Sequence, residues 1–531
     1  MTSLLTLLVL VAPASFLAVR LVALARPGDE PDLVARSGNL AAVVGVIASI
    51  GAGVAVALDG LIESPTWGWR GLGFSIRLDP LSTLMFAMIT VLALVIFRYS
   101  CTYLEGDERH GRFLGRLAAT VAAVEVLVLA GNLALLVVAW IATSMALHQL
   151  LVFYRDRRRA VIAARKKFIV ARLGDLFLIA AVVVLIVHFG TGNMQQIFDA
   201  VASTAQPTWQ LDAVGLAALC LAIAAMLKSA QFPTYGWLVE VMDTPTPVSA
   251  LLHAGILNAG PFLAIRMAYV IDGARVSTTM LIVVGGFTAV FASVTLLTQP
   301  SVKVALGYSS AAHMGFMLMI CGMGLFPAAL LHLVAHSFYK AHAFLSSGGV
   351  IDEARAAKVA LPRRLGSPTR IVASAAIALA MYLPLAVVFG VRFGGNPVVI
   401  AVGGILVMGT TQLIAPALDS AGRLAGTVRA AGLALAVTAS FFVLEAGAHH
   451  LLSDTVPESV GRDPFQLALI VAVLVAFATV VLLQIIEPTR AAGRRRQRLA
   501  IHFRNGLYVN AMFDRAIGAL RADAPAVQSS L

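Results

Sequence analysis

The chain has 531 residues, of which 59% are hydrophobic and only 12% are charged, and its formal net charge is +12. Soluble domains carry about 25% charged residues, and the mean hydropathy here is +0.89, so the composition excludes a soluble globular core. The sequence therefore predicts a polytopic membrane protein. Its three cysteines, Cys101, Cys220 and Cys321, are too few and too scattered for a disulfide framework or a metal cluster.

Apolar runs follow one another along most of the chain, and each is close to the roughly 20 residues that cross a bilayer as a helix. In chain order they occupy residues 3–25, 38–58, 78–97, 117–130, 132–153, 168–188, 213–232, 247–271, 277–297, 304–321, 327–350, 371–391, 398–418, 430–448 and 465–486. They predict an all-α fold with about fifteen transmembrane helices in a membrane domain over residues 1–489. The first run lacks a basic leading segment and a convincing cleavage site, so we interpret it as a retained helix.

The positions of the basic residues indicate the topology. With fifteen helices and the N-terminus outside, 29 of the 39 Lys and Arg residues fall in inner loops and the C-terminal tail, and 5 fall in outer loops. This asymmetry follows the positive-inside rule and predicts a cytoplasmic C-terminus. The excess positive charge then indicates membrane lipids as partners, through residues 155–159 and 494–496, and no nucleic acid.

Three ionisable side chains share one face of a predicted membrane helix. His332, His336 and Lys340 lie at positions i, i+4 and i+8 of an otherwise apolar run. Ionisable groups at bilayer depth usually line a pathway or a relay, so the spacing favours proton handling. The alternative is a polar face satisfied by hydrogen bonds between helices. A zinc site is disfavoured because the catalytic glutamate and a third ligand nearby are absent, and we expect no metal in this chain.

A second signal is a lysine beside a predicted helix break. Lys228 lies near the end of the apolar run 213–232, Pro233 follows five residues after it, and Pro245 and Pro247 open the next helix. Proline inside a membrane helix frees a backbone carbonyl, which is tolerated where protein or water satisfies it. A broken helix near Lys228 and Pro233 suits an ion path, although a proline kink can also serve packing alone.

These segments resemble a known signature, which reads KSAQFP at 228–233, DTPTPVSALLHAG at 243–255 and KVALGYSSAAHMGF at 303–316. It resembles the antiporter-like family of proton-conducting membrane subunits. That family includes the large proton-translocating chains of respiratory NADH dehydrogenase, the multisubunit sodium/proton antiporters and the membrane subunit of DAB inorganic carbon accumulation complexes. The resemblance covers roughly residues 78–351 and implies an antiporter-like fold.

The resemblance also implies a proton path. It gives Lys228 the role of central proton carrier, because the matching lysine holds that role in the family. The path is extended by the other titratable residues of the matched segments: His253, Lys303, His313, His332, His336 and Lys340. His313 has a second interpretation, as a hydrogen-bonding residue between helices. Physically, a buried lysine switches between holding and releasing a proton when a nearby charge moves, and histidine can pass protons through either ring nitrogen.

The chain departs from the family pattern at the carboxylate that modulates the lysine. The family has Trp-Glu in the fifth helix, whereas this chain has Trp140-Ile141. Glu125 precedes the Gly131-Asn132 turn by about as many residues as Ile141 follows it, so the two are expected at similar depth on adjacent helices. We therefore expect Glu125 to replace the missing carboxylate. The alternative is that Glu125 is a protonated packing residue.

Further positions indicate which branch of the family the chain resembles. Arg172 and Asp175, one helical turn apart, also match family positions and are expected to form a structural ion pair, with tuning of the path as the alternative. The helices between residues 371 and 448 contain no lysine, although respiratory chains carry one there, and Glu445 is the nearest titratable candidate. A short basic tail replaces the long lateral helix of the respiratory chain. These differences favour the DAB branch of the family.

The DAB branch implies a transporter subunit that is not itself an enzyme and that holds no cofactor. The expected partner is a cytoplasmic subunit that resembles a zinc-dependent β-carbonic anhydrase (DabA-type), and the expected location is the inner membrane of a bacterium. Three rival interpretations are a subunit of a redox-driven proton pump, a cation/proton antiporter subunit, and a scaffold with an inert polar axis.

The C-terminal tail, residues 490–531, is basic and amphipathic. Apolar residues recur in it at three- and four-residue spacing: Val509, Met512, Phe513, Ala516, Ile517 and Leu520. Such a stripe buries against the membrane domain, the lipid interface or a partner protein. The resemblance to DAB complexes favours a docking role for the tail.

Overall fold

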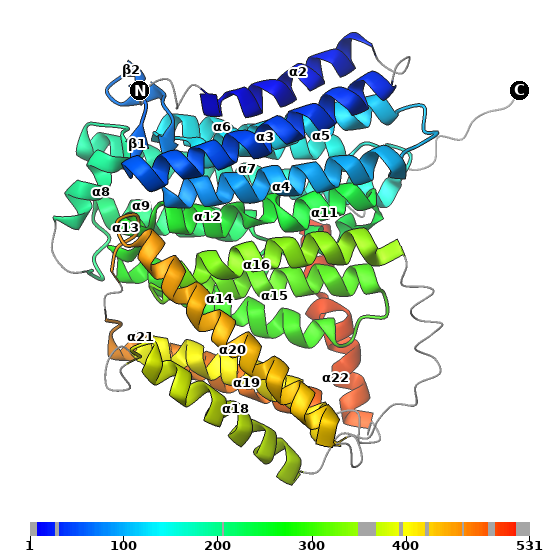
Figure 1. Ribbon diagram of the computed structural model, residues 1–531, viewed down its shortest axis with the longest axis vertical. Helices are drawn as coiled ribbons and strands as arrows, with labels where there is room; N and C mark the ends of the chain where they lie inside the picture. Colours follow the sequence, from blue (N-terminus) through cyan, green and yellow to red (C-terminus); the bar gives the residue numbers. More distant parts are fainter. Residues whose placement is uncertain are drawn as a thin grey trace, which may run out of the picture.

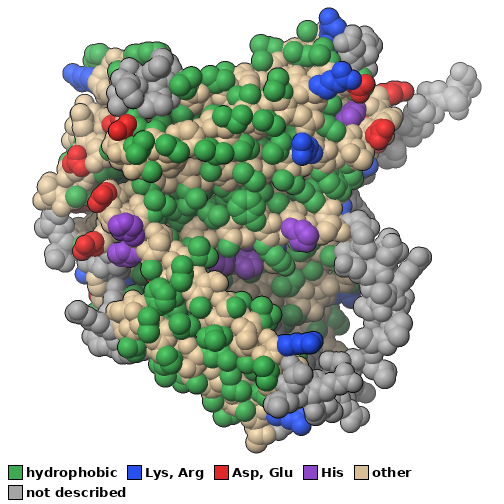
Figure 2. Space-filling model, viewed as in Figure 1, with side chains coloured by type: hydrophobic (Ala, Val, Ile, Leu, Met, Phe, Trp, Pro, Cys, Tyr) green, Lys and Arg blue, Asp and Glu red, His purple; other side chains and the backbone are tan. Residues whose placement is uncertain are grey.

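The computed structural model describes residues 8–26, 31–203, 207–348, 368–391, 397–419, 424–458, 461–486 and 494–516. Within these ranges almost all regular structure is helical, and the long helices lie side by side (Figure 1). Hydrophobic side chains cover most of the face shown in Figure 2, and many of the charged side chains lie toward the ends of the helices. This distribution is that of a multi-pass membrane protein, as the composition predicts.

The N-terminal part contains α2 (Val11–Ala25), α3 (Pro31–Asp59), α4 (Pro80–Tyr103), α5 (His110–Leu129) and α6 (Leu133–Leu151). Four short strands connect α3 to α4: β1 (Ile62–Glu63), β2 (Trp67–Trp69), β3 (Leu72–Phe74) and β4 (Arg77–Leu78). β1 pairs with β4 and β2 with β3, both antiparallel. The side chains of Asp79 and Asn132 accept backbone hydrogen bonds at the first turns of α4 and α6, which fixes where these helices begin.

The middle of the chain holds the interrupted helices. Its elements are α7 (Arg158–Phe189), α8 (Met194–Ala202), α9 (Ala213–Lys228), α10 (Gly236–Glu240), η1 (Val241–Asp243), α11 (Thr246–Ala254), η2 (Ile256–Asn258), α12 (Ala259–Arg266) and α13 (Ala268–Asp272). The helix broken near Lys228 and Pro233 is therefore confirmed. α7 begins at Arg158 and not near residue 168, so Lys166 and Lys167, assigned to a loop from the sequence, lie in a helix and are buried.

The remaining elements are α14 (Arg275–Leu296), α15 (Val302–Gly322), α16 (Phe326–Leu345), η3 (Ser346–Gly348), α18 (Pro368–Val388), α19 (Pro397–Asp419), α20 (Leu424–Leu452), α21 (Pro464–Ile486), α22 (Arg494–Arg504), η5 (Gly506–Tyr508) and α23 (Val509–Ala516). α14, α15 and α16 belong to the large central core. α18, α19 and α20 share two small apolar clusters of their own, and Val398 and Ala401 of α19 and Leu452 of α20 also join the central core. In Figure 1, α18 and α19 lie below α14 and α15, and α20 packs on α16.

The described residues include eleven helices that are long and apolar enough to cross a membrane. Two shorter apolar helices, Val11–Ala25 and Ala213–Lys228, accompany them. Each of the fifteen apolar runs overlaps a helix or an interrupted pair of helices, but α5 does not meet the same criteria. The all-α fold is thus confirmed, and the count of fifteen crossings stays a prediction.

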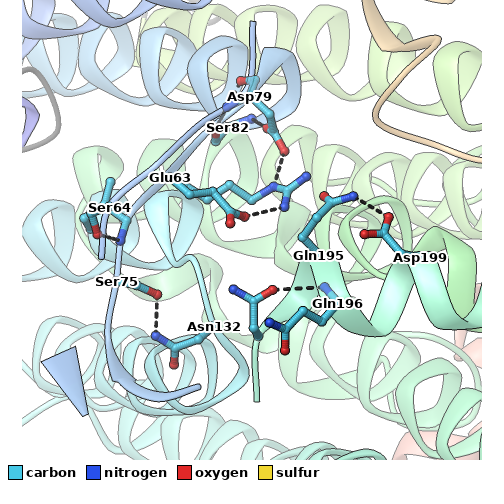
Figure 3. A network of polar contacts seen from close by, with 12 residues as sticks. Glu63, Ser64, Ser75, Asp79, Ser82, Asn132, Gln195, Gln196 and Asp199 are labelled. Atoms are coloured by element: carbon cyan, nitrogen blue, oxygen red, sulfur yellow. Dashed lines mark hydrogen bonds and ion pairs between the residues drawn. The ribbon is translucent and has the colours of Figure 1, made fainter. Parts of the chain in front are cut away.

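A polar network closes the end of the bundle that carries the short strands. Figure 3 shows Asp79 at the start of α4 and Glu63 and Ser75 in the strand segment, with Asn132 at the start of α6 nearby. The Asn132 amide donates to Ser75 Oγ at 2.6 Å. Two buried arginines bind Asp79: Arg266 Nη1 at 2.5 Å and Arg77 Nε at 2.7 Å from Oδ2. This network joins α4 to the interrupted helix that ends in α12.

The C-terminal tail packs on the membrane domain of its own chain. Tyr235 Oη donates to the carbonyl oxygen of Gly506 at 2.8 Å, and Asn510 and Asp514 meet Lys166 and Glu240 of the membrane domain. The side chains of Val509 and Phe513 pack against the main core, whereas Met512 is 68% exposed. The stripe thus buries in part against its own chain, the first of the three alternatives; Ile517 and Leu520 lie outside the described residues.

Candidate proton-conducting site

The interrupted helix places Lys228 at the end of α9. Backbone groups at the interruptions find side-chain partners: Phe232 N donates to Thr288 Oγ1 at 3.1 Å, and the Leu257 carbonyl in η2 accepts from Ser229 Oγ at 3.0 Å. A Cβ atom on Gly260 would overlap Ser229 and the Ala225 carbonyl, so only glycine lets α12 approach α9 this closely. The break is therefore supported by packing and hydrogen bonds from protein atoms.

The Lys228 amine is buried, with 7% of the residue exposed. Its Nζ lies 3.4 Å from the Trp140 carbonyl oxygen and 4.2 Å from the centre of the Trp140 ring. Asp175 of α7 is the acidic group that interacts electrostatically with this amine, and Arg172 opposes it. Lys228 thus contacts a carbonyl and an aromatic face and lies near a carboxylate, and among the described residues it forms no direct ion pair.

Glu125 does not contact Lys228. The side chain is fully buried in α5, and neither carboxylate oxygen has a hydrogen-bond partner in the described part of the chain. It lies toward α3, because a Cβ atom on Gly45 would be 3.6 Å from Glu125 Oε1. The equal depth expected for Glu125 and Ile141 therefore does not place the carboxylate beside the amine of Lys228.

Arg172 and Asp175 form the expected ion pair. Arg172 Nη2 lies 2.7 Å from Asp175 Oδ2, and α7, which carries both, packs on α9. Asp175 is buried, whereas the Arg172 side chain is 33% exposed, so only the acidic partner is shielded from water. Because Asp175 also interacts with Lys228, the pair belongs to the electrostatic surroundings of the lysine.

His253 and Lys340 belong to one hydrogen-bonded group. His253 Nδ1 lies 2.8 Å from Ser310 Oγ, and Ser310 Oγ donates to the Leu306 carbonyl at 3.1 Å. Lys340 Nζ donates to the same carbonyl, also at 3.1 Å. Both ionisable side chains are fully buried. The carbonyl of Leu306 thus connects α11, α15 and α16 through polar atoms.

Three histidines gather between α15 and α16. His313 Nδ1 lies 2.9 Å from His332 Nε2, and the centres of the His313 and His336 rings are 4.9 Å apart. The two nitrogens of His336 have no hydrogen-bond partner in the described part of the chain. The structure therefore brings His313 into direct contact with the helix that carries His332, His336 and Lys340.

Lys303 lies at the start of α15, where its Nζ is 3.4 Å from Thr246 Oγ1 at the start of α11. Among the described residues, we find no contact between Lys303 and the histidine group. A buried residue that the sequence did not single out, Lys167, donates to the carbonyl oxygen and the hydroxyl of Ser144 at 2.8 and 2.9 Å. Lys167 directly precedes the apolar run 168–188, and this position could have identified it. From the sequence it is assigned to a loop instead.

Comparison with known proteins identifies the class. A family model described as the transmembrane part of NADH:quinone oxidoreductase and Mrp antiporters matches residues 130–403, and one for the N-terminus of complex I chain 5 matches residues 70–114. The first match covers more than half of the chain. The chain therefore belongs to the antiporter-like family of proton-conducting membrane subunits.

Two relatives from different branches of that family are similar in sequence to this chain. The probable inorganic carbon transporter subunit DabB2 of Halothiobacillus neapolitanus is 38% identical over 448 residues, which cover 84% of this chain and 80% of the relative. NADH-quinone oxidoreductase subunit L of Escherichia coli is 33% identical over 334 residues, which cover 59% of this chain and 54% of that relative.

The fold has a solved counterpart. A structure of the Mrp complex from Dietzia sp. DQ12-45-1b matches with a TM-score of 0.61 at 22% identity, over 98% of this chain and 60% of that one. At this identity the likeness concerns the fold alone. It agrees with the antiporter-like architecture expected from the residues around Lys228.

Proposed function

We propose that this chain is the proton-conducting membrane subunit of a complex that accumulates inorganic carbon. The observation that supports it most is the set of titratable groups inside the helix bundle: Lys228, His253, His336 and Lys340 are buried, and the partly buried His313 and His332 adjoin them. Ionisable residues buried in a membrane domain usually mark an ion path or a proton relay. The identity with DabB2 over most of the chain directs the proposal to inorganic carbon.

The residues of the path divide into carriers and connectors. Lys228 and Lys340 are amines that contact neutral carbonyl oxygens, and neither forms an ion pair with a residue that the structure describes. Because Ser310 Oγ donates to the Leu306 carbonyl, it accepts from His253 Nδ1. In the pair His313 Nδ1 and His332 Nε2, one nitrogen donates and the other accepts. Protons move along such a set in short transfers, because each imidazole can accept at one nitrogen and donate from the other.

The partner in this proposal is a cytoplasmic, zinc-dependent subunit similar to β-carbonic anhydrases. Inward proton flow through the membrane subunit drives one-way hydration of CO2 to bicarbonate in that partner. The catalytic zinc and the hydration step belong to the partner, and the membrane subunit supplies the proton flux.

A second candidate is a proton-pumping subunit of an NADH dehydrogenase-like complex, favoured by the identity with subunit L. A third candidate is a cation/proton antiporter subunit, which the fold shared with the Mrp complex favours. Both predict other partners: quinone- and iron–sulfur-bearing chains for the first, and several small membrane chains for the second.

The partners discriminate between these functions. The chain is tagged at its chromosomal locus and purified in mild detergent, and the co-purifying proteins are identified by mass spectrometry. Uptake of labelled inorganic carbon is then measured in cells with and without the chain. We expect a soluble zinc protein and uptake that a protonophore abolishes. Iron–sulfur chains, or sodium-sensitive growth with normal carbon uptake, would overturn the assignment to inorganic carbon.

A further inference from the structure

One face of α6 presents polar groups at successive turns toward α7 and α9. Trp140, Ser144 and His148 are spaced by four residues, so they lie on the same side of the helix. Lys228 reaches the carbonyl oxygen of Trp140 at 3.4 Å, and Lys167 reaches that of Ser144 at 2.8 Å. Carbonyl groups four residues apart are separated by about 6 Å along a helix. The two buried amines therefore lie about one turn apart along α6.

Within the described ranges, no carboxylate is bonded to Lys167. Its hydrogen bonds go to the neutral backbone and hydroxyl of Ser144, and it is 4% exposed. The charged groups that act on it are Lys228 from α9 and Arg172 and Asp175 from its own helix, and His148 of α6 interacts with it too. Asp175 is already paired with Arg172. Cations therefore outnumber carboxylates in this cluster.

Two buried amines with so little negative charge nearby disfavour the state in which both are protonated. Like charges at short range raise the free energy of the doubly charged state, and coupled groups of this kind titrate as a pair. A proton on Lys167 favours release from Lys228, and a neutral Lys167 lets Lys228 hold its proton. Repulsion from a second lysine can thus change the protonation state of Lys228, as a moving carboxylate would.

We propose that Lys167 is a second proton-carrying residue, which exchanges a proton with Lys228 through the Ser144 hydroxyl and replaces the carboxylate absent at Ile141. The inference rests on the proposed proton conduction through Lys228. In the exchange an N–H bond of the Lys167 ammonium breaks as its proton passes to Ser144 Oγ. The hydroxyl gives up its own proton, directly or through one water, and an N–H bond forms on the Lys228 amine. His148, one turn beyond Ser144, extends this route toward the end of α6 at Leu151.

The test measures proton flux in sealed vesicles from cells that carry the full chain with its natural partners, using an internal pH dye over a range of external pH. Lys167→Met should lower the flux about tenfold or more near neutral pH and move the pH profile to higher pH, because an unopposed Lys228 holds its proton more tightly. Lys167→Arg should also fail, since arginine keeps its charge. Arg165→Met removes an exposed cation two residues away and should leave the flux unchanged.

Ser144→Ala keeps both lysines and removes the hydroxyl, so it should slow the flux even if the Lys167 variants insert poorly. Normal flux in Lys167→Met or Ser144→Ala, or a lower flux with an unshifted profile in Lys167→Met, would overturn the role of Lys167. The Lys228→Ala variant distinguishes a failure of the proposed function from a failure of the role given to Lys167. If that variant conducts normally, the proposed function fails; if it does not conduct while the Lys167 and Ser144 variants behave as wild type, only the second carrier fails.

Discussion

The amine of Lys228 lies 4.2 Å from the centre of the Trp140 ring and 3.4 Å from the carbonyl oxygen of the same residue. The ring attracts an ammonium through its quadrupole, and the carbonyl distance is long for a strong hydrogen bond. Neither contact fixes the charge as an ion pair would. Trp140 therefore positions the amine and leaves its protonation state to the charges around it.

The first prediction compares two carboxylates. Asp175→Asn should reduce proton flux about tenfold or more, because Asp175 is the acidic group that acts on Lys228. Glu125→Gln should reduce it far less, since Glu125 has no bond to the lysine and the amide preserves its shape. Flux is measured in vesicles with equal amounts of inserted protein. The reverse order of effects would restore Glu125 as the modulating group.

The second prediction concerns the pair His313 and His332, whose nitrogens lie 2.9 Å apart. If both serve one relay, His313→Ala should slow proton flux about as much as His332→Ala, and the double variant should be little worse than either. The comparison is a double-mutant cycle of flux at one pH. Additive losses would mean that the two histidines act independently, with His313 serving packing between α15 and α16.

The third prediction concerns the contact between the tail and the membrane domain. Lys166 is buried and meets Glu240 and Asp514, so Lys166→Met leaves two facing carboxylates without their cation. We expect the tail to detach and to become sensitive to added protease in membranes. Arg515→Met, at an exposed site of α23, is the matched control. Equal protease resistance in Lys166→Met and wild type would show that apolar packing alone holds the tail.

The fourth prediction concerns stability at the strand end of the bundle. Burial by itself raises the pKa of the Asp79 carboxyl, but Arg266 and Arg77 outweigh it and hold the pKa below its usual range. A carboxyl with a lowered pKa stabilises the fold above its ordinary pKa of about 4, and this stabilisation is lost as the pH falls toward the lowered value. Asp79→Asn, which removes one partner of a buried pair, should cost about 3–5 kcal/mol.

The measurement is the thermal unfolding midpoint of the purified chain in detergent at several pH values. Acidification should lower the midpoint of the wild type more than that of Asp79→Asn. Asp59→Asn, which changes an exposed carboxylate at the end of α3, serves as the control and should behave as wild type. Parallel pH curves for wild type and Asp79→Asn would contradict this role of Asp79.

The sequence predicts the features that depend on local chemistry. Apolar runs locate the helices, Pro233 marks the break after Lys228, and four-residue spacing places His332, His336 and Lys340 on α16. The beginning of α7 is mispredicted because its first turns are basic and resemble a loop. The neighbours of Lys228 and the contact of His313 with His332 depend on how helices pack, which periodicity within one helix does not encode.

The most direct test of the central claim is proton flux through the Lys228→Ala variant. Sealed vesicles that contain equal amounts of inserted wild-type or variant protein receive an acid pulse outside, and the internal pH is followed with a dye. We predict that Lys228→Ala conducts no more than vesicles without the chain, and that Lys228→Arg fails as well because arginine does not release its proton. Wild-type flux in Lys228→Ala would contradict a proton path through this residue.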